Sequence, residues 1–429
     1  MSFMKKSAAA LVLTGVAAAT STALAAGFQL TEQSSLGAGR AYAGAGIVGD
    51  DLSAVHYNPA GMTLLEGTRF QAGGVWIALN ADYSGNDGSS ENGRLKGQMI
   101  PAGYVTHQVN DKIWLGFAMT VPFGMGTEYD KHWSDNQRGT NAKIYTFDMN
   151  PNIAYKVSDF LSVGAGISVQ YAKAELGMGL HNKDLGGYIG HGKVEADSWD
   201  WGFNFGVMIS PTDKLRFGLA YRSSIEHEAE GDTTISGTNQ VLQNFLEGQQ
   251  FGMTTTIETP DTVMLTGTWE ATDQLRLSGL IRWANWSKFK ELNIKNELPF
   301  ALANSALGSK FKSLDIQNDW QDTWLFSVGA DYKINNAFTV RGGIAYETSP
   351  IDDQSTRMAV IPDTDRVWLS LGASWYATKD LQFDVGATYL MGVGDTDLYN
   401  ATKDEGGTKV GEFDSLDAYL LGVQMQYRF

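Results

Sequence analysis

The sequence predicts an all-β fold, a transmembrane antiparallel β-barrel of about fourteen strands with an N-terminal hatch inside its lumen. Three observations predict it. From residue 68 to residue 429, apolar and polar residues alternate over segments of about ten residues or more, the length that crosses a bilayer at a tilt. Short polar turns alternate with long polar connections along this region. The preceding residues, 26–67, are rich in Gly and Ala and have no regular alternation of their own.

Residues 1–25 have the features of a secretory signal peptide. Lys5 and Lys6 form its positive region, residues 8–19 its apolar region, and Ala23-Leu24-Ala25 a small-residue cleavage site. A membrane anchor is the alternative, but the segment is short, rich in Ala and ends in a cleavage site. No run of about 18 apolar residues follows it, so helices are not expected to cross a membrane.

The composition excludes several classes of protein. The 429 residues include no Cys, which excludes a disulfide scaffold and Cys-ligated metal sites. The formal net charge of −16 argues against a nucleic acid or an anionic membrane surface as partner. A mean hydropathy of −0.21 is compatible with a barrel, because only alternate residues of its strands face lipid.

Residues 26–67 are predicted to form the hatch. Their Gly residues allow tight turns and close packing, but the segment cannot build a core of its own, so something has to enclose it. Phe28 and Leu30 are apolar side chains near its start, and they either face a ligand or pack against the wall. In Asn58-Pro59-Ala60, Pro59 fixes the backbone and the Asn58 side chain can bond neighbouring backbone groups. An ordinary Asn-Pro turn is the alternative.

Residues 68–429 are predicted to form the barrel. In the clearest strands, residues 381–391 and 418–429, every second residue is apolar. Six short turns are expected at residues 110–111, 158–159, 211–213, 272–273, 335–336 and 378–380. Seven long connections are expected near residues 82–97, 123–141, 177–192, 228–252, 289–313, 349–363 and 395–412. This arithmetic gives an even strand number with both chain ends on the short-turn side, and closure leaves no unpaired edge in lipid. A soluble sandwich is disfavoured because these strands are long.

Aromatic residues near the strand ends suit the two interfacial girdles of such a barrel. The tryptophans concerned are Trp76, Trp114, Trp199, Trp201, Trp283, Trp286, Trp320, Trp324, Trp368 and Trp375. Trp114 and Trp368 fall on the lumen phase of their strands, so they are expected to line an apolar passage instead.

Several arginines also fall on the lumen phase. They are Arg216, Arg222, Arg276, Arg282, Arg341 and Arg366. Facing lipid at mid-depth would cost about 2–4 kcal/mol each, which favours the inward phase. Pairing with lumen acids such as Asp148, Asp331 and Asp384 is the favoured interpretation. Bidentate binding of a ligand carboxylate is the alternative.

Two long connections have unusual apolar content. One contains Val241, Leu242, Phe245, Leu246, Phe251 and Met253, and the other, residues 298–311, contains Phe300, Leu302 and Leu307. Their spacing predicts short amphipathic helices that offer an apolar patch or cap the barrel mouth. The acidic residues of the other loops are expected to form a solvated face. Binding of divalent cations against lipopolysaccharide is their alternative role.

No pattern typical of catalysis or metal binding occurs. The six His residues have no paired spacing, and there is no G-x-S-x-G, Walker or H-E-x-x-H motif. An outer-membrane lipid hydrolase would need a Ser–His pair on the wall, and a general porin would need an open polar lumen. We therefore expect no enzyme activity, no metal and no cofactor.

Four segments carry a resemblance to a known family. They are AGFQL at residues 26–30, GRAYAGAG at residues 39–46, Asn58-Pro59-Ala60, and VPFGMGTEYD at residues 121–130. They resemble the FadL-type outer-membrane transporters for long-chain fatty acids and other hydrophobic molecules, and the resemblance extends to the last residue, Phe429. It implies a hatch that blocks the lumen and contributes, through Phe28 and Leu30, to the ligand pocket. It also implies a capture groove on the external loops, here formed by Leu242, Phe245, Leu246 and Phe251.

The resemblance further implies a lateral opening where the third strand kinks inward. That strand is expected at residues 112–121, and the candidates for the kink are Gly116, Pro122 and Gly124, since Pro cannot donate to the ladder and Gly often marks a bend. The arginines proposed for a fatty-acid carboxylate are Arg216, Arg282 and Arg366.

The sequence therefore predicts a monomer in the outer membrane of a Gram-negative bacterium, with both chain ends in the periplasm. The resemblance implies that it admits long-chain fatty acids or similar hydrophobic molecules by passive diffusion and releases them sideways. Aromatic or alkane hydrocarbons are the alternative ligands. The other expected partners are outer-membrane lipid, lipopolysaccharide and the barrel-assembly machinery, which would recognise the terminal Phe429.

Overall fold

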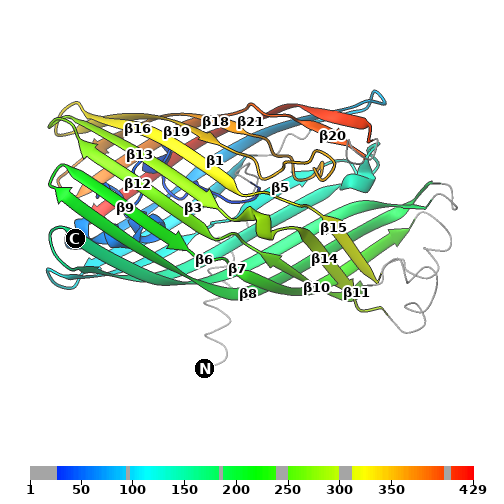
Figure 1. The fold of residues 1–429 in the computed structure, drawn as a ribbon, viewed down its shortest axis with the longest axis horizontal. Coiled ribbons are helices and arrows are strands. Elements are labelled where there is room, and N and C mark those ends of the chain that lie inside the picture. Colours follow the sequence, from blue (N-terminus) through cyan, green and yellow to red (C-terminus); the bar gives the residue numbers. More distant parts are fainter. Residues whose placement is uncertain (1–26, 93–96, 183–186, 238–249, 299–311, 401–406) are drawn as a thin grey trace.

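The alternating segments pair in chain order, each antiparallel to the next, and the first and last strands close the barrel (Figure 1). The computed structural model describes residues 27–92, 97–182, 187–237, 250–298, 312–400 and 407–429. The all-β fold and the 14 strands predicted from the sequence are confirmed. The expected signal peptide, residues 1–25, lies outside the described residues, as do Leu242, Phe245 and Leu246.

Nine wall strands are continuous, and five are interrupted. The continuous strands are β1 Thr68–Gly85, β3 Gln98–Gln108, β6 Asn141–Lys156, β7 Leu161–Asn182, β8 Gly187–Thr212, β17 Phe338–Glu347, β18 Arg366–Tyr376, β19 Leu381–Gly392 and β21 Lys409–Arg428. The interrupted strands are β4 Ile113–Thr120 with β5 Gly124–Glu128, β9 Leu215–Arg222 with β10 Glu226–Gly237, β11 Gln250–Glu258 with β12 Thr262–Glu270, β13 Leu275–Ala284 with β14 Glu291–Asn296, and β15 Ser313–Gln317 with β16 Thr323–Lys333. The connections contain β2 Ser90–Asn92, β20 Asp397–Tyr399 and the short 3-10 helix η2 Asn136–Arg138. The 3-10 helix η4 Trp286–Lys288 lies in the interruption between β13 and β14.

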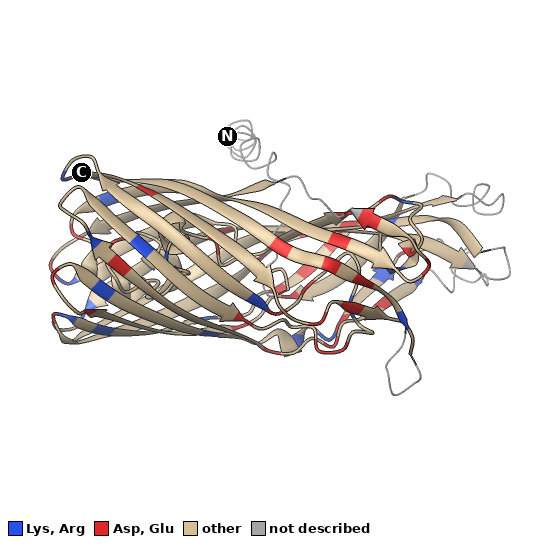
Figure 2. Ribbon diagram, turned by 90° about the horizontal axis from the view of Figure 1, so that it is seen from above, with Lys and Arg blue, Asp and Glu red and all other residues tan. Residues whose placement is uncertain are grey.

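The six predicted short turns lie at one end of the barrel, but several predicted long connections are partly strand. The prediction of a loop at residues 177–192 is wrong, because β7 and β8 continue as a ladder to the pair Asn182 and Gly187. Ion pairs such as Lys173 with Glu195 and Lys193 with Glu175 cross this extension. Charged pairs stabilise strands outside lipid, so the polar composition that suggested a loop is compatible with a hairpin. Figure 2 shows acidic residues on several strands toward the end of the barrel that lies away from the C-terminus.

The outward face carries an apolar band bounded by aromatic rings. Along β16, Trp324 and Tyr332 lie outward near the two strand ends, and Val328 between them is 66% exposed. Trp199 and Trp201 on β8 and Trp375 on β18 are also exposed. An aliphatic band between aromatic girdles is the lipid-facing surface of an outer-membrane barrel.

Four tryptophans predicted from the same pattern lie elsewhere. Trp114 and Trp368 are buried in the lumen, as their strand phase predicts. Trp286 and Trp320, expected in a girdle, are also buried, because η4 and the residues before β16 turn into the barrel. These two do not contribute to the girdles.

The hatch occupies the short-turn half of the lumen (Figure 1). It contains α2 Ser35–Ala38, α3 Ala54–Tyr57 and the 3-10 helix η1 Pro59–Leu64, and nearly all of its side chains are buried. The Ser34 side chain caps α2 by accepting a hydrogen bond from the Gly37 N–H at 2.9 Å. Among the described residues, no helix is both long enough and apolar enough to cross a membrane.

Candidate functional site

A ring of inward-facing wall glycines, here called the glycine collar, holds the hatch. Its members are Gly116, Gly164, Gly206, Gly218, Gly329, Gly343, Gly372, Gly386 and Gly422, and a Cβ added to any of them would meet the hatch first. At Gly386 that Cβ would lie 2.1 Å from the Ser35 carbonyl oxygen, and at Gly343 it would lie 2.3 Å from that of Arg40. Only Gly allows the two backbones to approach so closely. At these collar positions, the wall backbone therefore lies directly against the hatch, with no wall side chain between them.

Asn58, Pro59 and Ala60 join the hatch to the wall beside this collar. The Asn58 amide donates to the Val207 carbonyl on β8 at 3.1 Å, and its oxygen accepts from the Ala60 N–H at 3.1 Å. Pro59 begins η1, where its missing N–H costs no hydrogen bond. The motif thus caps a helix and contacts the wall at the same time.

A buried ion-pair network fixes the hatch at the short-turn end. Arg40 lies between Asp50 of the hatch, at 2.8 Å, and Asp331 of β16, at 3.4 Å. Asp331 also pairs with Arg341 at 3.0 Å, and Asp50 pairs with Arg276 at 3.1 Å. Burial alone would raise the pKa of Asp50, but Arg40 and Arg276 hold it below its usual range.

We predict that Arg40→Met lowers the free energy of unfolding by about 3–5 kcal/mol, because it leaves two buried carboxylates short of a partner. Arg216→Met is the control. Arg216 also faces inward, but its guanidinium makes one hydrogen bond, at 3.3 Å to the Val48 carbonyl, so a loss below about 1.5 kcal/mol is expected. Urea titration of the refolded proteins measures both values, and equal losses would contradict the assignment.

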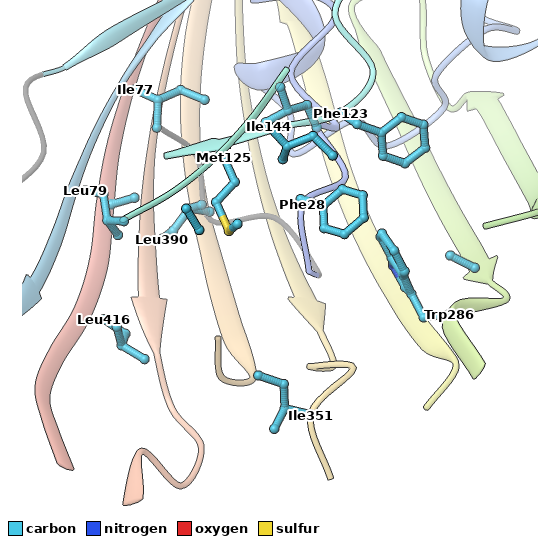
Figure 3. Close-up of a cluster of buried hydrophobic side chains, with 14 of the residues drawn as sticks. Phe28, Ile77, Leu79, Phe123, Met125, Ile144, Trp286, Ile351, Leu390 and Leu416 are labelled. Carbon is cyan, nitrogen blue, oxygen red and sulfur yellow. The ribbon is translucent and has the colours of Figure 1, made fainter. Parts of the chain in front are cut away.

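The start of the hatch inserts Phe28 into an aromatic cluster. The Phe28 ring lies 4.6 Å from Trp286, 5.7 Å from Trp320, 5.8 Å from Phe289 and 6.1 Å from Phe123, measured between ring centroids. Figure 3 shows Phe28 beside Phe123, Met125 and Trp286. Edge-to-face packing of this kind holds a side chain in one place.

An apolar cavity, here called the outer cavity, opens on the long-loop side of Phe28. It has a volume of about 670 Å³, part of it open to solvent. Its apolar walls come from Phe28, β5, β6, β7, β8, β11, β14 and the connection before β18, through residues such as Met125, Ile144, Ile257, Ile294 and Met358. The polar residues of its lining are Lys143, Glu175, Thr255 and Asn318. A concave, mainly apolar site of this size suits a hydrophobic small molecule.

A second cavity, here called the inner cavity, lies between the hatch and the wall. Gln29, Leu30, Thr31, His56 and Tyr57 line it from the hatch. Its wall residues include Pro122 and Phe123 on one side and Arg222, Met264 and Arg282 on the other. Phe28 therefore lines the outer cavity, and the residues directly after it line the inner one.

The third strand leaves the wall at residues 121–123. The ladder between β3 and β4 ends at the pair Gly103 and Met119, and β5 pairs with β6 on its other side. Residues 98–102 of β3 pair with β1 but have no ladder partner on the side of the third strand within the described chain. The first four residues of β5 are buried, which places β5 inside the barrel. The wall therefore has a gap in its hydrogen-bonded ladder between β3 and β5.

Of the three candidate kink residues, two flank this gap. Pro122 lies in the break, and Gly124 begins β5. Gly116 is not a kink, because its ladder with Thr106 and Asn152 is unbroken. It belongs to the collar, where a Cβ would lie 2.3 Å from the Met62 sulfur.

The hatch covers the break with its own backbone. The Leu30 N–H donates to the Pro122 carbonyl, and the Gly124 N–H donates to the Phe28 carbonyl, both at 2.8 Å. The Gln33 side chain donates to the Val121 carbonyl at 2.7 Å. Residues 28–33 thus replace the ladder partners that the third strand loses when it turns inward.

Five of the six lumen arginines, all except Arg216, pair with acids among the described residues, as the sequence favoured. Arg222 lies 3.4 Å from Asp148, and Arg341 lies 3.0 Å from Asp331 and 3.9 Å from Asp384. The three arginines proposed for a ligand carboxylate differ in position. Arg282 lines the inner cavity, whereas Arg216 and Arg366 line neither cavity. Phe251, proposed for ligand capture, packs in a separate cluster with Ile189 and Ile235.

One Ser–His–Asp contact occurs on the wall, but it lacks the geometry of a catalytic triad. The Nδ1 atom of His227 contacts both Ser198, at 3.1 Å, and Asp200, at 3.2 Å, and its Nε2 atom contacts Gln170 at 3.0 Å. A triad needs the serine and the carboxylate on opposite ring nitrogens. Within the described residues, no group of acidic or His side chains could hold a metal ion.

Sequence reasoning missed Thr31, Glu32, Trp286, Glu347 and the collar. Trp286 and Glu347 come close to the hatch only through barrel closure, which no local pattern reveals. The collar had one signal, namely Gly on the lumen phase of many strands, but its meaning requires the position of the hatch.

A closed barrel with a lipid-facing band, a filled lumen and an apolar cavity defines a plugged outer-membrane transporter of hydrophobic compounds. A family profile described as "Outer membrane protein transport protein (OMPP1/FadL/TodX)" matches residues 16–429, and the chain belongs to this family. Members of this family are non-enzymatic channels, and this chain is a bacterial outer-membrane transporter of hydrophobic compounds.

The chain is similar to curated relatives in sequence and to solved structures in fold. The chain is 31% identical to outer membrane protein P1 of Haemophilus influenzae, over 91% of each chain. It is 29% identical to a long-chain fatty acid transport protein of Escherichia coli, over 96% of this chain and 97% of the relative. Its fold matches a Pseudomonas aeruginosa FadL homologue with a TM-score of 0.82 at 23% identity, over 94% and 100% of the two chains. It matches the Ralstonia pickettii toluene transporter TbuX with a TM-score of 0.69 at 19% identity, over 92% and 98%.

Proposed function

We propose that the protein takes up long-chain fatty acids or similar hydrophobic molecules by passive diffusion and releases them sideways through the gap between β3 and β5. One observation carries the proposal. The same hatch segment, residues 28–33, separates the outer from the inner cavity and covers the break in the third strand. A movement of this short segment would connect both cavities with the wall gap.

The seating of the remaining hatch supports exit through the wall. Residues 35–62 contact the glycine collar, and the Arg40 network ties them to β16. Unseating residues 35–62 would break many contacts at once, whereas residues 28–33 lie outside the collar and are held by hydrogen bonds and by the buried side chains of Phe28 and Leu30. The cargo would enter from the long-loop end, rest in the outer cavity, and leave at the depth of the gap.

The short-turn end, which carries the two ends of the barrel, would face the periplasm, as in the outer-membrane pattern of short periplasmic turns. Phe429 lies at this end and is 77% exposed, so it is accessible to an assembly factor. The protein would act as a monomer, since one chain closes the barrel. Outer-membrane lipid and lipopolysaccharide would surround it.

An aromatic or alkane hydrocarbon is the second candidate cargo. The observation that favours it is the pairing of Arg282 and Arg366 with Glu347 and Asp363, which leaves those guanidinium groups engaged. The outer cavity would hold a hydrocarbon through apolar contacts alone. A relative named for long-chain fatty acid transport is 29% identical to the chain, whereas the toluene transporter TbuX is 19% identical, and we therefore place fatty acids first.

Uptake by cells tests the proposal. A strain without the protein, and the same strain with the protein restored, would be grown on oleate and on an aromatic hydrocarbon as the carbon source. Restored growth on oleate supports the first candidate, and restored growth on the hydrocarbon alone supports the second. Unaltered growth on both would contradict transport of either cargo.

We predict that Ile294→Asn weakens binding of an apolar fluorescent probe to the purified protein. Ile294 is buried and lines the outer cavity, and an amide there has to be desolvated, at a cost of about 1–3 kcal/mol. The expected loss of affinity is about 5- to 150-fold. Lys295→Asn, at the next residue and on the exposed face, is the control and should bind normally. Equal affinity for the probe in all three proteins would contradict the placement of the site.

A further inference from the structure

The hatch contains one acidic side chain that its packing does not explain. Glu32 is 1% exposed, and neither of its carboxylate oxygens makes a hydrogen bond to another described residue. It lies between Thr31, which contacts the wall on one side, and Gln33, which contacts the break in the third strand. An unpaired carboxylate at such a depth is costly, whereas a protonated carboxyl is tolerated.

The surrounding charges do not balance if Glu32 is ionised. The charged groups around it are Glu347 at the end of β17, Arg282 on β13 and Arg366 on β18, with Asp363 bound to Arg366. Three acids then face two arginines. Both arginines are engaged with the other two acids, because Arg282 lies 2.7 Å from Glu347 and Arg366 lies 2.8 Å from Asp363.

This cluster also holds the hatch on either side of Phe28, at Gly27 and at Thr31. The Gly27 N–H donates to Asp363 at 2.8 Å, and the Thr31 hydroxyl accepts from Arg282 at 2.7 Å. Burial raises the pKa of Tyr42 and Tyr57, the two tyrosines of the hatch near Glu32, so their phenol groups are neutral and supply no compensating charge. His56, which lines the inner cavity, is kept neutral by burial and by Arg222 and Arg282.

We propose that Glu32 is a proton-controlled latch, which keeps residues 27–33 seated while its carboxyl is protonated and favours their release when it ionises. The regulation of uptake that follows from this rests on the proposed function, but the latch itself does not. Release would open the passage between the two cavities and uncover the wall gap, without unseating the collar-bound part of the hatch.

The direction of the pH dependence follows from where the proton is held. Burial, and then the charge of Glu347, raise the pKa of Glu32 from its ordinary value to about 8 in the seated segment. In a released, hydrated segment the carboxyl would ionise near its ordinary value of 4.5. Between these two pH values release frees one proton, so the released population rises up to about tenfold per pH unit and levels off above pH 8.

Thiol labelling in the full-length protein tests the latch, since the chain has no Cys of its own. Leu30→Cys places a thiol on the buried side chain that lines the inner cavity, and a small maleimide reports its exposure. The rate is measured from about pH 6 to pH 9 with Glu32 present and with Glu32→Gln, so that the thiol's own titration cancels in the ratio. We expect the labelling rate with Glu32, divided by the rate with Glu32→Gln, to rise with pH and then to level off.

Two further variants separate a latch from general loosening. Leu36→Cys lies in the collar-bound α2 and should stay unlabelled at every pH. Glu347→Gln removes a neighbouring negative charge and so lowers the pKa of Glu32 in the seated segment. The ratio should then level off at a lower pH, and its total rise should be smaller. A ratio that is flat with pH, or equal labelling at positions 30 and 36, would overturn the proposal. Because no cargo is present, this result is independent of the uptake experiment.

Discussion

Deletion of residues 27–60 is expected to convert a closed barrel into an open, ion-conducting pore. The hatch fills the short-turn half of a lumen that a barrel of this strand number is too wide to fill with wall side chains. In planar bilayers, the intact protein should show no sustained current, and the deletion variant should show large, stable steps. An intact protein that conducts as freely as the variant would support a general porin instead.

A single collar substitution should have a smaller effect of the same kind. In Gly343→Val, the new side chain would meet the Arg40 backbone at 2.3 Å, so the hatch has to shift and the current should flicker. Gly342→Val is the matched control, because Gly342 faces outward and a Cβ there meets its first neighbour at 3.5 Å. The control should remain closed. Identical currents from both variants would contradict the role of the collar.

Repair of the third-strand break is expected to abolish uptake while the barrel still folds. In Pro122→Thr with Gly124→Val, the chain regains an N–H donor and gains two β-branched residues, so β4 can continue beside residues 98–102 of β3. Uptake should fall to the level of a strain without the protein. Binding of the apolar probe to the outer cavity should persist.

The control for this repair is Pro151→Thr, because Pro151 lies in the unbroken ladder between β4 and β6. It should transport normally. Slower hydrogen exchange at residues 98–102 would report that the repaired ladder has formed. Normal uptake through a barrel that shows this protection would exclude the gap as the exit.

The sequence predicted the features that depend on local periodicity. Leu381, Phe383 and Val385 alternate with polar residues, and these residues form β19 with the expected faces. The turns at residues 110–111 and 335–336 also follow from local Asn and Asp chemistry. The ends of strands were less predictable, because the charged side chains between residues 173 and 195 are as compatible with a paired hairpin as with a solvated loop.

The site depends on contacts between distant parts of the chain, so the sequence indicated less of it. Phe28 and Leu30 could be selected as large apolar residues near the start of a Gly- and Ala-rich hatch, but the partners that enclose Phe28, such as Trp286, come from interrupted wall strands. The pairing of Arg282 with Glu347 joins residues on strands that are not neighbours. Glu32 carries no local signal, because its meaning arises from burial and from the charges around it.

Photo-crosslinking with a fatty acid that carries a diazirine at the end of its chain tests the central claim, that cargo leaves through the wall. Adducts trapped during uptake by cells would be located by peptide mass spectrometry. We predict adducts in the outer cavity, on residues 28–33, and at the gap on residues 98–102 and 121–123. Adducts along residues 38–51 and the collar, with none at the gap, would mean that cargo passes straight through the hatch and would contradict the account.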